Sequence, residues 1–137
     1  MTEPRTGLPL PHAYPCLLLD RIVEVGTGRS ARAVKNLAHD DPLLDAAGRL
    51  PPVLLAEAIA QAAGVAAIGL HDGVTCVLAR IDRFRSRATI IHAGDRLEIS
   101  VRVLKVFGTI VKARGVVRAG GRICAAAEVF LQLSGPP

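Results

Sequence analysis

Aromatic side chains are scarce in this chain of 137 residues, which has three Phe, one Tyr and no Trp. Half of the residues are nevertheless hydrophobic, so we expect a core built from Val, Leu, Ile and Ala. Proteins that bind single-stranded nucleic acids usually stack bases on aromatic rings or carry a recognisable binding motif. The sequence has neither feature, and we therefore predict no nucleic-acid partner.

Cysteine is also sparse. The three cysteines, Cys16, Cys76 and Cys124, are an odd number and lack the spacing of metal ligands. This usage is typical of proteins in a reducing compartment. The sequence therefore predicts a cytoplasmic protein that holds no metal ion.

No segment reads as a targeting or membrane element. Residues 1–7 are mostly polar and no apolar stretch follows them, so we predict no signal peptide. The longest apolar stretch, about 50–70, opens with two prolines and is interrupted by Glu57 and Gln61. These features predict a buried helix and no membrane span.

Positive charge exceeds negative charge by five, and arginine supplies most of it. A basic surface of this kind attracts acidic proteins and phosphate groups over a distance. The alternative interpretation is that these arginines lie on the solvated faces of strands.

The stretch 52–71 is the only long segment with the character of a helix. It is apolar nearly all the way round, which indicates burial on most sides. Glu57 and Gln61 interrupt it four residues apart, so both lie on one face, one turn from each other. A carboxylate in a buried helix is costly unless it has a partner or a function. Glu57 is therefore the first candidate for a functional residue.

The remaining pattern predicts strands on both sides of the helix. After a leading segment at 1–16 we expect strands at 17–25 and 30–38, and after the helix four strands in a meander, at 74–83, 95–107, 109–118 and 122–133. Alternation is plainest in the second of these four, where Leu97, Ile99, Val101 and Val103 share one face. We predict a single α+β domain over residues 1–137, in which a six-stranded antiparallel sheet wraps around one central helix.

Four stretches resemble a known family, the hot-dog-fold 3-hydroxyacyl-[acyl carrier protein] dehydratases. Residues 10–21, LPHAYPCLLLDR, resemble the family's opening L-P-H-R-Y-P-F-L-L-V-D-R, and residues 33–36 resemble its A-x-K-N strand. Residues 57–64, EAIAQAAG, resemble its helix E-A-x-A-Q-x-x-G. Residues 81–85, followed by Gly94 and Asp95, resemble its next strand and turn. The resemblance extends over about residues 8–133.

The resemblance implies a homodimer, often assembled further, in which two sheets join side by side and the active site lies at the interface. In the family, a His of a G-H-F-P loop acts on the C2 proton, and a helix carboxylate of the other subunit acts on the 3-hydroxyl. A backbone N–H at the helix start holds the thioester oxygen. The substrate arrives on the phosphopantetheine arm of acyl carrier protein, no further cofactor is needed, and the product is a trans-2-enoyl thioester. By this resemblance Glu57 is the catalytic carboxylate and Gln61 a substrate-binding residue, and we expect Glu57 to open onto an apolar tunnel at the interface.

Two family features are missing before the helix. No histidine lies between Pro42 and Glu57, where G-H-F-P is expected, and His39 is the nearest candidate for a substitute base. Pro52, which has no N–H, stands where the family has the glycine that holds the thioester oxygen. The N–H groups of Val53 and Leu54 are the replacements we expect, because the first N–H groups of a helix lack partners within it.

Of the other histidines, His12 matches a position that we interpret as structural, and His71 and His92 are expected at the surface. The sequence leaves several functions open: a dehydratase with a rearranged site, acting on acyl carrier protein or acyl-CoA substrates; a hot-dog thioesterase that uses Glu57; a subunit that contributes Glu57 to a dimer with a His-bearing paralogue; or an acyl-binding scaffold.

Overall fold

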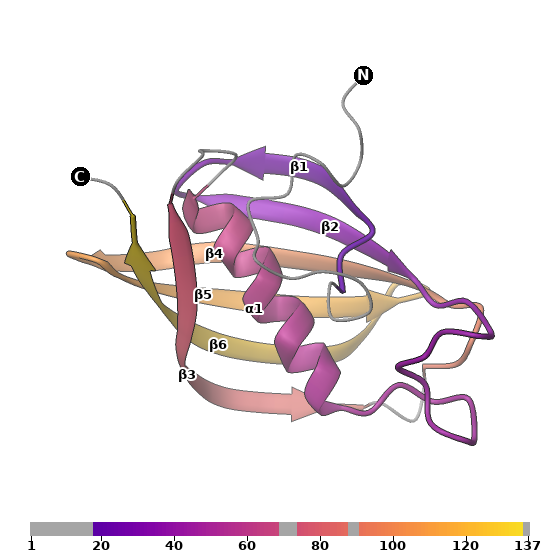
Figure 1. The fold of residues 1–137 in the computed structure, drawn as a ribbon. Helices are drawn as coiled ribbons and strands as arrows, with labels where there is room; N and C mark the ends of the chain where they lie inside the picture. Colours follow the sequence, from indigo (N-terminus) through magenta and orange to yellow (C-terminus); the bar gives the residue numbers. More distant parts are fainter. Residues whose placement is uncertain (1–17, 69–73, 88–90, 136–137) are drawn as a thin grey trace.

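A computed structural model of the chain describes residues 18–68, 74–87 and 91–135. These residues form one helix and six strands (Figure 1). The elements in chain order are β1 Arg21–Gly26, β2 Ser30–Asn36, α1 Val53–Ile68, β3 Thr75–Ser86, β4 Arg96–Phe107, β5 Ile110–Ala119 and β6 Arg122–Ser134. His12, Cys16, His71 and the predicted last turn of the helix lie outside the described residues.

The six strands form one sheet in the order β1-β2-β4-β5-β6-β3, and every neighbouring pair is antiparallel. The sheet curves, and α1 lies across its concave side (Figure 1). The predicted α+β architecture, with an antiparallel sheet wrapped around one long helix, is therefore confirmed. Figure 1 also shows that β3 ends at the same end of the molecule as the first turn of α1.

The predicted meander of the last four strands is wrong. Only β4, β5 and β6 follow one another across the sheet, whereas β3 pairs with β6 at the far edge and β4 pairs with β2. The long connection between β2 and β3, which contains α1, lets β3 begin at the other edge of the sheet from β1. β3 also continues to Ser86, beyond the end predicted at residue 83.

The core lies between α1 and the sheet. The alternation predicted in β4 is confirmed, because Leu97, Ile99 and Val101 are buried while their neighbours are exposed or half-buried. The helix comes close to the sheet where β5 has Gly115, since a Cβ atom there would overlap the side chain of Ile59. The lack of a side chain at Gly115 thus permits a close contact between helix and sheet.

Candidate functional site

Glu57 and Gln61 are joined on one face of α1, as their spacing predicts. Gln61 Nε2 donates a hydrogen bond to Glu57 Oε2 at 3.1 Å. Gln61 Oε1 accepts a hydrogen bond from the backbone N–H of Leu18 at 2.8 Å. Gln61 is almost completely buried, with 1% of its surface exposed, and Glu57 is half-buried in the single chain.

The bond from Leu18 decides how the amide of Gln61 is oriented. Because the amide oxygen faces a backbone donor, the NH₂ group must face Glu57. Gln61 therefore presents a donor to one carboxyl oxygen of Glu57 and holds that side chain in place. These contacts show Gln61 as a residue that positions Glu57, while its predicted contact with substrate stays a prediction.

A buried ion pair anchors the loop that leads from β2 to α1. Lys35 Nζ lies 3.1 Å from Asp41 Oδ2 and 3.8 Å from Asp20 Oδ1. The side chains of Lys35 and Asp41 are both nearly buried. Asp20 also accepts a hydrogen bond from the N–H of Asn36 at 2.6 Å. The sequence motif that includes Lys35 and Asn36 therefore has a structural use, which is to hold the loop before the helix.

At the start of α1, one of the two backbone N–H groups predicted to be unpaired forms a hydrogen bond. Leu54 donates its N–H to Pro51 O at 3.0 Å, and Leu55 donates to Pro52 O at 2.9 Å. The prediction that the N–H of Leu54 is unpaired is therefore wrong, because the first turn tightens and uses it. Val53 is the first residue of the helix, and its N–H remains the candidate donor for a thioester oxygen.

His39 lies near the junction of β2 and β4. Leu37, two residues earlier, exchanges backbone hydrogen bonds with Gly94 and Asp95. The ring of His39 packs beside Gly94 and its side chain is exposed. Within residues 18–68, 74–87 and 91–135, no hydrogen bond or ion pair joins His39 to Glu57. No such contact thus links the two side chains within the described part of the single chain, and the role of His39 as a substitute base stays a prediction. His92 is exposed, as expected, and its N–H donates to Asp95 Oδ2.

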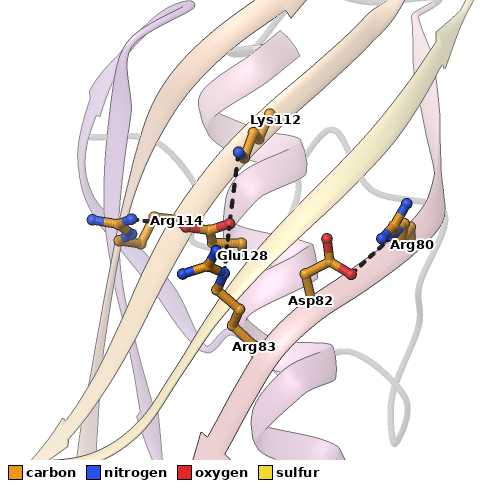
Figure 2. Close-up of polar contacts among 6 residues, drawn as sticks. All are labelled: Arg80, Asp82, Arg83, Lys112, Arg114 and Glu128. Carbon is orange, nitrogen blue, oxygen red and sulfur yellow. Dashed lines mark hydrogen bonds and ion pairs between the residues drawn. The ribbon is translucent and has the colours of Figure 1, made fainter.

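A second carboxylate, Glu128 on β6, lies on the sheet face away from the helix (Figure 2). Arg114 Nη2 donates to Glu128 Oε2 at 2.7 Å, and Lys112 and Arg83 lie 3.7 and 4.0 Å from Glu128 Oε1. The hydrogen bond from Arg114 and the three positive charges hold the pKa of Glu128 below its ordinary value, although desolvation opposes them. Glu128 therefore stays ionised and ties β3, β5 and β6 together.

The Glu128 cluster was not predicted from the sequence. Alternation along β6 places Glu128 on the outer face, but only the pairing of β6 with β3 and β5 brings three cations to it. Arg83 has a left-handed backbone (φ 55°) in the irregular part of β3, a conformation that costs a residue with a side chain about 1–3 kcal/mol.

Other features of the described residues bear on the predicted chemistry. Cys76 and Cys124 are free thiols. No group of three or more His, Cys, Asp or Glu in the described ranges is arranged to hold a metal ion. That the whole protein holds no metal ion stays a prediction. In the part of the chain that the structure describes, no helix has the length and apolar character needed to cross a membrane.

The sequence and the fold both match known proteins. The family model described as "ApeP-like: ApeP dehydratase" matches residues 6–131. The chain belongs to this family of dehydratases. It is 39% identical over 127 residues to the 3-hydroxyacyl-[acyl-carrier-protein] dehydratase FabZ of Pelotomaculum thermopropionicum, a match that covers 88% of this chain and 90% of the relative. The corresponding protein of Caldanaerobacter subterraneus is 34% identical over 131 residues, covering 91% and 92% of the two chains.

A solved structure shares the fold of this family member. The dehydratase heterocomplex ApeI:P from Xenorhabdus doucetiae superposes with a TM-score of 0.80 at 20% sequence identity, covering 100% of this chain and 93% of the other. The hot-dog fold and the dehydratase family, which the motifs at residues 10–21 and 57–64 indicated, are thereby confirmed. The roles of Glu57, His39 and the helix N–H groups stay predictions.

Proposed function

We propose that this chain takes part in the dehydration of 3-hydroxyacyl thioesters, carried by acyl carrier protein or coenzyme A, in fatty acid or related acyl-chain synthesis. Glu57 is the acid in this proposal and a second subunit supplies the base. The supporting observation is the hydrogen-bonded pair Glu57–Gln61, whose donor orientation is set by Leu18. The similarity to 3-hydroxyacyl-[acyl-carrier-protein] dehydratases supports the reaction class.

The reaction needs a base for the C2 proton and an acid for the leaving hydroxyl. The base removes the proton from C2, the electron pair forms the C2–C3 double bond, and the 3-hydroxyl leaves as water with a proton from Glu57. Gln61 donates to Glu57 Oε2 and so orients the carboxyl group that delivers this proton. The N–H of Val53 is the proposed donor to the thioester oxygen, which gains negative charge as C2 loses its proton.

The base is proposed to come from a His-bearing paralogue. The loop between Pro42 and Glu57 contains no histidine, and His39 makes no hydrogen bond to Glu57 within the described ranges. The structural neighbour from Xenorhabdus doucetiae is itself a dehydratase heterocomplex. In a mixed dimer, this chain would contribute the carboxylate of Glu57 and the paralogue would contribute the histidine, and the two would form a complete catalytic pair.

The edge strand β3 is the proposed dimer contact. Among the strands that the structure describes it has a neighbour, β6, on one side only, and it exposes the apolar residues Val77 and Ile81 (63% and 37%). An open edge with exposed apolar side chains favours pairing with a second sheet. The same proposal places the protein in the cytoplasm, in keeping with the free thiols of Cys76 and Cys124.

The test is a turnover assay with a 3-hydroxyacyl thioester. We expect the purified chain alone to form little enoyl thioester, and its mixture with a G-H-F-P-bearing dehydratase from the same organism to form it readily. Glu57→Gln should remove the increase in enoyl thioester that mixing produces, whereas the exposed control Glu98→Gln should retain this increase. Full activity of the chain alone would overturn the mixed dimer, and full activity of Glu57→Gln in the mixture would overturn the role of Glu57.

A further inference from the structure

A hollow of about 520 Å³ opens at one end of the sheet, where β3 finishes and β6 starts. Three arginines line it: Arg85 in β3, Arg87 just after β3, and Arg122 at the first position of β6. Ser86, the half-exposed Ile123 and Ala126 also line it. The volume lies within the range of hollows that hold small ligands, about 300–1,000 Å³.

The described residues that line this hollow carry only positive charge. Its lining contains no Asp or Glu, and none of its three arginines forms an ion pair within residues 18–68, 74–87 and 91–135. Two other hollows on the sheet, both lined by Arg32 and Arg118, each include a carboxylate, Glu98 or Glu24. Three like charges around one hollow repel one another, and an anion would relieve that repulsion.

Cys124, which also lines the hollow, contributes no negative charge. Its thiol is buried and donates to Val117 O at 3.3 Å. Burial raises the pKa of Cys124 to about 11, so the group remains a neutral thiol at physiological pH. Among the described lining residues only the arginines are therefore charged, while the carboxylate of Asp95, outside this lining, also acts on the Cys124 thiol.

The kind of anion follows from the lining. Guanidinium groups bind phosphate oxygens through paired N–H donors, and several arginines together match the multiple oxygens of one phosphate. The hydroxyl of Ser86 adds a further donor, and the side chain of Ile123 offers an apolar contact for the body of the ligand. We propose that this hollow binds the phosphate group of a phosphate ester.

The proposed function supplies a candidate ligand of this chemistry, and the choice of that ligand rests on it. A thioester substrate on acyl carrier protein or on coenzyme A has a phosphate on its pantetheine arm. The hollow lies at the end of β3, on the side of the molecule where α1 begins (Figure 1). Binding of the phosphate there would place the carrier beside the edge strand proposed to form the dimer.

The test compares 4′-phosphopantetheine with pantetheine, which differ only in the phosphate, by isothermal titration calorimetry on the purified chain and on its mixture with the paralogue. We expect at least a tenfold preference for the phosphorylated ligand, competition by inorganic phosphate, and weaker binding at higher salt. Arg85→Gln and Arg122→Gln should each lower the affinity about tenfold or more, as loss of a hydrogen bond to a charged group does.

Arg96→Gln is the matched control, because Arg96 is exposed at the start of β4 and does not line this hollow. Equal affinity for the two pantetheines, or equal losses in Arg96→Gln and Arg122→Gln, would overturn the proposal. Coenzyme A in a parallel titration distinguishes the sources: tighter binding than 4′-phosphopantetheine indicates that its additional phosphates are also recognised. The binding measurement does not depend on turnover. Dehydration without a preference for the phosphorylated ligand would therefore refute this site alone. A preference for the phosphorylated ligand without dehydration would refute the proposed reaction alone.

Discussion

Gln61 holds Glu57 from one turn further along α1, with 3.1 Å between Gln61 Nε2 and Glu57 Oε2. The amide is itself held by the backbone of Leu18, a residue 43 positions away in the chain. A buried amide thus links the segment before β1 to the carboxylate on the helix. Two residues of one family motif therefore act as a unit, the first in the proposed chemistry and the second in its geometry.

Replacement of Gln61 tests this unit. Gln61→Leu leaves the N–H of Leu18 without its acceptor, and we expect a loss of about 1–3 kcal/mol in the free energy of unfolding. Activity of the mixed assembly should fall through kcat more than through KM, because Glu57 loses its orientation. Denaturant unfolding and steady-state kinetics measure the two effects. An unchanged kcat in a folded variant would contradict the positioning role.

Gln61→Glu tests the same contact by charge. Two carboxyl groups at this distance cannot both ionise easily, so the pKa of one of them should rise. A carboxyl whose pKa is raised by folding binds more protons in the folded state, so the variant should lose stability relative to the wild type as pH rises above about 4.3. Unfolding measured between pH 4 and 8 checks this sign. A stability difference that does not grow with pH would show that the two groups do not interact.

Glu128→Gln should lower stability at neutral pH and have little effect in acid. The pKa of Glu128 is held below its ordinary value of 4.5, mainly by the hydrogen bond from Arg114. The ionised form therefore stabilises the folded state above pH 4.5, and this contribution is lost as pH falls through the lowered pKa. Denaturation curves at pH 7 and below pH 4 measure the difference. Glu98→Gln, on the exposed outer face of β4, is the control and should show a weaker dependence.

Asp41→Asn should destabilise the protein by about 3–5 kcal/mol, because it leaves the buried ammonium of Lys35 without its nearer partner. The double variant Lys35→Met with Asp41→Leu should recover part of this loss, since no unpaired charge then remains. The exposed pair Arg32–Glu24 is the matched control, and its removal should change stability by about 1 kcal/mol or less. Thermal unfolding compares the four proteins. A loss after Asp41→Asn no larger than that of the exposed pair would refute a structural role for the buried pair.

Val77→Lys should weaken the proposed assembly through β3. The side chain of Val77 is largely exposed on the edge strand, and a charge there opposes pairing with a second sheet. We expect sedimentation to shift towards the monomer, with the fold retained. Val106→Lys, at a similarly exposed position of β4 (57%), is the control and should not change the assembly. If only Val106→Lys dissociates the protein, the contact lies elsewhere.

Local periodicity was sufficient to predict much of the fold. The alternation of Leu97, Ile99 and Val101 identified β4 and its buried face, and the apolar stretch after Pro51 and Pro52 identified α1. Both predictions work because side-chain direction repeats every two residues in a strand and every 3.6 in a helix. Periodicity does not say which strands pair, and the expected meander failed at β3 for this reason.

The sequence by itself determined the one-helix α+β architecture, the family, and the placement of Glu57 and Gln61 on one helix face, because each of these depends on residue types at short spacings. Only the tertiary structure decided the contacts between distant segments. It brought Leu18 to Gln61, three cations to Glu128, and Arg85 and Arg122 to one hollow. It also showed the N–H of Leu54 bonded to Pro51 and His39 packed beside Gly94. Such contacts depend on where α1 crosses the sheet and which strands it places side by side, and no local pattern encodes that crossing.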